Sequence, residues 1–125
     1  MPLARMYCGE FRWRGDRKID RVVYRFEPPG EPVRGESEVV GAGTYDAGDR
    51  VLALRQTARF RPADGGIEVR ERTDPPGDPK YIVDGAYRGW VATDGSTLVA
   101  VWTTRRTGDK GDLRMRACAD GVPTS

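Results

Sequence analysis

Hydrophobic and polar residues alternate along most of the chain, which is the pattern of strands that bury one face. Val22, Tyr24 and Phe26 alternate with Arg21, Val23 and Arg25, and the same period of two runs through residues 51–61 and 67–73. Helical periodicity is scarce, because glycine or proline interrupts most windows long enough to hold a helix. The pattern therefore predicts an all-β protein whose strands carry an apolar face and an arginine-rich face.

Turn signals rich in Gly, Pro and Asp divide the chain at nearly even intervals, ending with Gly108–Asp112. Asp-Gly and Gly-Gly pairs tolerate the positive φ values of tight hairpins. Every connection is short enough for a hairpin, so the simplest topology is an antiparallel meander. The predicted strands cover residues 6–13, 19–27, 34–45, 51–61, 67–73, 81–91, 97–104 and 113–118.

A meander of eight strands exposes two unpaired edges unless its first and last strands pair. Closure gives an eight-stranded antiparallel up-and-down barrel, and the alternative is an open two-sheet sandwich. We predict the barrel, as a single domain over residues 1–118 that is followed by a loose tail over 119–125.

The two cysteines bear on closure independently. If Phe11 and Leu113 point inward, Cys8 and Cys118 both point outward by parity, and antiparallel pairing brings them to the same end of the barrel. A cross-strand disulfide requires that arrangement. The alternative is two unrelated reduced thiols, which a cytosolic location favours.

Length and composition restrict the class of protein. A chain of 125 residues is expected to form one domain. Its longest apolar run, Leu98–Trp102, is far shorter than the roughly 20 residues of a transmembrane helix, so no membrane association is expected. The N-terminal residues lack the apolar core of a secretory signal, which predicts a cytoplasmic protein.

The absence or scarcity of some residue types excludes several kinds of catalytic and metal site. The chain has no histidine, so histidine-based triads and the commonest metal ligand are excluded. Two distant cysteines cannot form a four-ligand zinc site, and neither a metal nor a cofactor is expected. Arginine greatly outnumbers lysine, which reflects either codon usage or a surface for phosphate or carboxylate groups. Acids lie close to most arginines, and this mixture argues against nucleic-acid binding.

Short motifs add a family resemblance. Gly9-Glu10-Phe11 with Trp13 is similar to the opening strand of calycin barrels, the lipocalin-like and avidin-like proteins. The segment from Asp84 to Trp90, continued by Leu98–Trp102, resembles the late hairpin of small streptavidin-type barrels. The resemblance implies a barrel with a ligand cavity and does not indicate which ligand it holds.

Parity along each strand assigns side chains to the barrel interior. The residues predicted to point inward are Phe11, Trp13, Val22, Tyr24, Phe26, Val39, Tyr45, Leu52, Leu54, Phe60, Ile67, Val69, Val83, Tyr87, Leu98, Trp102, Leu113 and Met115. These side chains either fill the barrel or surround a small ligand.

Two polar residues, Gln56 and Glu71, share the inward parity. A buried carboxylate needs a partner, so Glu71 is expected to meet a tyrosine or an arginine if it lies inside. Its place near a strand end favours the alternative that it reaches water at the rim. The candidate ligand-binding residues are Tyr24, Tyr45, Gln56, Glu71, Tyr87 and Trp102.

Trp90 has outward parity beside Arg88, and an exposed tryptophan often marks an interface, here with a second copy of the chain. The function predicted first is non-catalytic binding of a small, partly apolar ligand. One alternative is an interaction module with a packed barrel that docks a partner through its outer arginine and tryptophan face. A second alternative is an isomerase or cyclase in which Glu71 and tyrosines act as acid and base.

Overall fold

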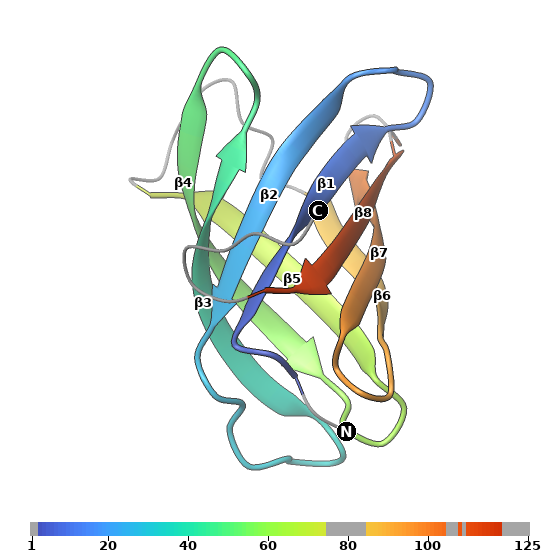
Figure 1. Ribbon diagram of the computed structural model, residues 1–125. Helices are drawn as coiled ribbons and strands as arrows, with labels where there is room; N and C mark the ends of the chain where they lie inside the picture. Colours follow the sequence, from blue (N-terminus) through green and yellow to red (C-terminus); the bar gives the residue numbers. More distant parts are fainter. Residues whose placement is uncertain (1–2, 75–84, 105–107, 109, 119–125) are drawn as a thin grey trace.

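The computed structural model describes residues 3–74, 85–104, 108 and 110–118, which form one closed β-barrel (Figure 1). Its eight strands follow one another around the barrel in chain order, and the all-β fold is confirmed. The described part contains no helix that could span a membrane. The strands are β1 (Met6–Trp13), β2 (Ile19–Phe26), β3 (Ser37–Asp46), β4 (Val51–Phe60), β5 (Gly66–Thr73), β6 (Gly85–Val91), β7 (Thr97–Thr104) and β8 (Lys110–Ala117).

Pairing of the first strand with the last closes the barrel. β1 lies between β2 and β8, antiparallel to both, and its register with β8 runs from Tyr7 opposite Ala117 to Trp13 opposite Gly111 (Figure 1). The predicted closure is therefore confirmed. Neither β1 nor β8 is therefore left as an unpaired edge strand.

A disulfide joins Cys8 and Cys118, whose Cα atoms are 5.9 Å apart. Cys8 lies on the outer side of β1, and Cys118 follows the last residue of β8. Of the two alternatives that the sequence left open, the structure contains the bridge. Cys8 is nevertheless only 5% exposed, because the bridge itself occupies that side of the strand.

One end of the barrel is closed by the segment that precedes β1. Leu3 and Ala4 pack against the core, and the Ala4 amide donates a hydrogen bond of 3.0 Å to the hydroxyl of Tyr7. That hydroxyl donates in turn to the carbonyl of Gly95, at 2.7 Å. Tyr7 is completely buried. It shares the inward parity of Phe11, but the predicted set of interior residues omitted it.

Two strands start three residues away from the predicted position, and several other strand ends differ by one residue. β3 starts at Ser37 instead of residue 34, because Arg34 and Gly35 take φ values of 55° and 81° in a tight turn. β8 starts at Lys110, so part of the predicted Gly108–Asp112 turn is strand. The predicted strand residues 81–84, with Val83, and the tail 119–125 lie outside the described residues.

Candidate functional site

The end of the barrel opposite Tyr7 contains an open pocket of about 260 Å³, which we call the mouth pocket. At this end β1, β3, β5 and β7 finish, and β2, β4, β6 and β8 begin. Most lining residues are aromatic or aliphatic, and a few carry charges. They are Phe11, Trp13, Asp20, Tyr45, Ala47, Asp49, Arg50, Leu52, Tyr87 and Trp102.

Phe11 is the centre of the aromatic wall. Its ring centroid lies 5.3 Å from Trp13, 5.9 Å from Tyr87 and 6.1 Å from Tyr45. Trp13 also meets Trp102 edge-to-face at 5.1 Å. Edge-to-face pairs of this kind are favourable beyond the area that they bury, so the wall is a rigid, apolar surface.

Two glycines make room for these rings. A Cβ atom at Gly111 would lie 2.0 Å from the Phe11 ring, and one at Gly85 would lie 2.3 Å from the Trp102 indole. The strands can carry such large inward rings here only because the neighbouring strands present no side chain. Gly111 is therefore an inward-facing residue of β8 and not part of a turn, which explains why β8 starts earlier than predicted.

Asp20 and Tyr45 form a polar pair in the lining of the pocket. The Tyr45 hydroxyl donates a hydrogen bond to Oδ2 of Asp20, whose other oxygen lies 3.7 Å from Lys18 Nζ. Both residues are buried, with exposures of 8% and 6%. Burial, followed by the bond to Asp20, raises the pKa of Tyr45 above its ordinary value.

A second polar pair lies deeper in the barrel. Tyr24 donates a hydrogen bond of 3.0 Å to Glu71, which is 7% exposed. The favoured prediction that Glu71 reaches water at the rim was therefore wrong. The reason is that Tyr24, on the strand across the interior, supplies a donor that makes burial of the carboxylate tolerable.

Gln56 is also buried inside the barrel, with an exposure of 2%. Neither atom of its amide has a hydrogen-bond partner among the described residues. Its amide faces Gly41 and Gly43 on β3, where an added Cβ would lie 3.3 Å from the oxygen and the nitrogen respectively. The side chain fills the space that the two glycines leave.

The six predicted ligand-binding residues are thus divided between two levels. Tyr45, Tyr87 and Trp102 line the mouth pocket, whereas Tyr24, Gln56 and Glu71 lie outside its lining. Sequence reasoning did not select Asp20, although it continues the alternation of Val22 and Tyr24. It also missed Ala47, Asp49 and Arg50, which enter the pocket from the turn between β3 and β4.

The outer face carries the two residues predicted to form an interface. Trp90 is 54% exposed, and the guanidinium of Arg61 lies 5.7 Å from the centre of its ring. Arg88 points outward and donates from Nε to Glu68 at 2.8 Å. The outward parity of both residues is confirmed.

Comparison with models of protein families, with curated proteins and with solved structures finds no match for this chain. The likeness to calycins is therefore shown only as an eight-stranded up-and-down barrel. In the described part of the chain, no group of three or more His, Cys, Asp or Glu side chains is placed to hold a metal ion.

The raised pKa of Tyr45 predicts a loss of stability at high pH. Tyrosine in the unfolded chain ionises near pH 10, whereas Tyr45 stays neutral in the barrel. Above that pH the unfolded state binds fewer protons than the folded state, so the free energy of unfolding falls as pH rises. Tyr7, whose pKa burial also raises, contributes to the same fall.

Urea unfolding between about pH 8 and pH 11 measures this effect. We expect Tyr45→Phe to be less stable at neutral pH, because Asp20 loses a donor, and to lose less stability as pH rises. Equal slopes in the variant and the original protein would contradict the assignment.

Proposed function

We propose that the barrel binds a small, partly apolar ligand in the mouth pocket without catalysing a reaction on it, as the resemblance to calycin barrels implies. The observation that carries this proposal is the composition of the pocket. Five aromatic side chains form its wall, while the Asp20–Tyr45 pair, Asp49 and Arg50 supply a few polar contacts. Apolar concavities with a small number of placed polar groups are the usual form of small-molecule sites.

The volume limits the size of the ligand. About 260 Å³ is slightly below the roughly 300–1,000 Å³ typical of sites for drug-sized molecules. The middle of the barrel is occupied by core side chains, among them Val22, Leu54, Val69 and Leu113. The proposed ligand is therefore compact, and it rests on Phe11 without reaching the closed end.

Native mass spectrometry of the protein from its own host, followed by titration of the compound that co-purifies, tests this function. Trp13 lines the pocket and is only partly buried, so we expect its replacement to change the wall at a smaller cost in stability than replacement of the buried Trp102. We expect Trp13→Leu to weaken binding about tenfold or more, because a buried aromatic contact of the ligand disappears. The matched control is Trp90→Leu, which makes the same change on the outer face.

Binding that is equally strong in Trp13→Leu and Trp90→Leu would contradict a site in the mouth. So would a protein that carries no added mass from its host.

Docking through the outer face is the second candidate function, and the exposure of Trp90 favours it. Val99, directly opposite Trp90 on β7, is 40% exposed, so the two side chains form a continuous apolar patch. The proposed occupant is a second copy of the chain. The native mass spectra described above also report subunit number, and a dimer that Trp90→Leu dissociates would support this candidate.

The acid–base alternative has less support in the geometry. Glu71 does not belong to the lining of the mouth pocket, and its carboxylate accepts a hydrogen bond from Tyr24. A general base must come within hydrogen-bond distance of the proton that it abstracts.

A further inference from the structure

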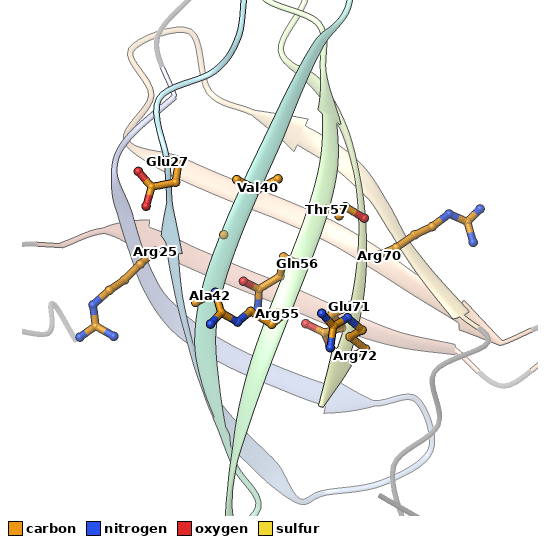
Figure 2. A pocket seen from close by; sticks show the side chains of 11 residues that line it. Arg25, Glu27, Val40, Ala42, Arg55, Gln56, Thr57, Arg70, Glu71 and Arg72 are labelled. Atoms are coloured by element: carbon orange, nitrogen blue, oxygen red, sulfur yellow. The ribbon is translucent and has the colours of Figure 1, made fainter. Parts of the chain in front are cut away.

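Charge is distributed unequally between the inside and the outside of the barrel. Among the described residues, the only charged side chains that are buried belong to Asp20 and Glu71, and no arginine or lysine is buried. Arg70, the neighbour of Glu71 in the chain, is exposed and extends away from its strand (Figure 2). The described interior therefore combines aromatic rings with negative charge.

Asp20 brings one of these carboxylates to the mouth pocket. It lies directly opposite Phe11 in the register of β2 with β1, and both side chains line the pocket. Oδ2 of Asp20 accepts the hydrogen bond from Tyr45, whereas Oδ1 is buried with no hydrogen-bond partner among the described residues. A buried carboxylate oxygen without a donor is costly, so this position suits a ligand that supplies one.

Lys18 meets the charge of Asp20 only in part. Its Nζ lies 3.7 Å from Oδ1, which makes an ion pair but exceeds the length of a hydrogen bond, and its side chain is 56% exposed. Exposed pairs of this kind contribute little, because the lysine remains hydrated. The pair shows which sign of charge Oδ1 attracts, and the donor position at this oxygen stays unfilled.

Tyr45 responds to the same negative charge. Burial raises the pKa of its hydroxyl most, and the bond to Asp20, the charge of Asp20 and the charge of Glu71 raise it further. Glu71 does not line the pocket, so it influences the pocket through its charge. Asp49 and Arg50 add one charge of each sign from the turn between β3 and β4, and the formal charge of the lining stays negative.

We propose that the ligand of the mouth pocket is a compact primary amine with an apolar body, bound as an ammonium ion that donates to Oδ1 of Asp20. This inference rests on the proposed function, because it names the chemical class of the ligand in the same pocket. Aromatic rings attract cations through the negative potential of their faces, and five rings line this pocket. The attraction is stronger in a site that is partly withdrawn from water.

The pocket is less suited to an anionic or a neutral ligand. A carboxylate placed at Oδ1 of Asp20 would meet a like charge at a buried position, which is costly. Arg50 is the only basic residue in the described lining, and its neighbour Asp49 lines the pocket as well. A neutral apolar molecule could contact the rings but would leave Oδ1 without a donor.

Three probes of similar size separate charge from apolar fit. They are 2-phenylethylamine as the cation, 2-phenylethanol as its neutral analogue and phenylacetate as the anion. Isothermal titration calorimetry with the whole chain, at neutral pH and physiological salt, measures the Kd of each probe. We expect the amine to bind about tenfold or more tightly than the alcohol, and the carboxylate to bind least, because hydrogen bonds between charged groups are the stronger ones.

Two variants are expected to change the affinity for the amine in opposite directions. Asp20→Asn keeps an acceptor for Tyr45 and removes the charge, so it should weaken amine binding about tenfold or more and leave the alcohol within about twofold. Lys18→Gln removes a competing cation at an exposed position, so it should strengthen amine binding about twofold or more without affecting the alcohol.

Equal affinities for the amine and the alcohol, tighter binding of the carboxylate, or no saturable binding of the amine would overturn the inference. A change of amine affinity in the same direction in both variants would also overturn it. If Asp20→Asn fails to fold, the probes and Lys18→Gln still decide. In each of these cases the proposed function survives if a compound co-purifies and Trp13→Leu weakens its binding, so the two failures can be told apart.

Discussion

Replacing Trp102 with alanine is expected to lower the free energy of unfolding by about 3–5 kcal/mol. The indole is 5% exposed, although it lines the mouth pocket. It packs against Trp13 at 5.1 Å and Tyr87 at 6.5 Å, and the backbone of Gly85 covers its face. Removal of the indole leaves a cavity that Gly85, which has no side chain, cannot fill. The expected loss is a large share of the free energy of unfolding of a small domain.

The matched control is Trp90→Ala, and urea denaturation measures the free energy of unfolding of both variants. Trp90 is mostly exposed and interacts with Arg61 through its ring, so its loss should cost less than about 1 kcal/mol. Similar losses in the two variants would show that Trp102 is a replaceable part of a loose mouth and not part of the core.

Removing the disulfide is expected to cost about 2–5 kcal/mol. The bridge joins residues 110 positions apart, so in the unfolded chain it closes a loop that contains nearly the whole barrel. It also links the two strands whose pairing closes the sheet, next to the hydrogen bond from the Cys118 amide to the carbonyl of Met6. Loss of the bridge therefore weakens the pairing of β1 with β8 and increases the conformational entropy of the unfolded chain.

Cys8→Ala/Cys118→Ala is the appropriate variant, because Cys8 is buried and alanine leaves no hydroxyl without a partner. The original protein unfolded with a reductant should match it. An unfolding curve that does not respond to reductant would contradict the expectation. Bridges of this kind persist in oxidising compartments, so the disulfide is an argument against the cytoplasmic location that the N-terminal residues predict.

The hydrophobic pattern predicted the fold because every strand repeats one simple rule. Val22, Tyr24 and Phe26 show the period of two, and the connections between strands are short enough for hairpins, which makes a meander the simplest topology. Closure of the barrel was predicted because an open meander leaves its first and last strands with unpaired edges. The parity of Cys8 and Cys118 added a check that did not depend on hydrophobicity.

The functional candidates were predicted less completely. Parity placed Tyr45, Tyr87 and Trp102 inside, where they line the mouth. It could not tell how far along the barrel each side chain lies, because the strands are tilted and staggered relative to one another. Tyr24 and Gln56 share the same inward parity and yet belong to a deeper level.

The sequence by itself determined the strands, their order, their inner and outer faces and the ends at which the cysteines meet, since these depend on local period and turn length. Only the tertiary structure decided the environment of each polar group. Tyr24 and Glu71 share a hydrogen bond although they are 47 residues apart in the sequence. Arg25 and Arg72 lie in one row of directly opposed residues that crosses four strands, from β2 to β5. Such neighbours arise from the register of a closed sheet, which fixes distances that no single strand contains.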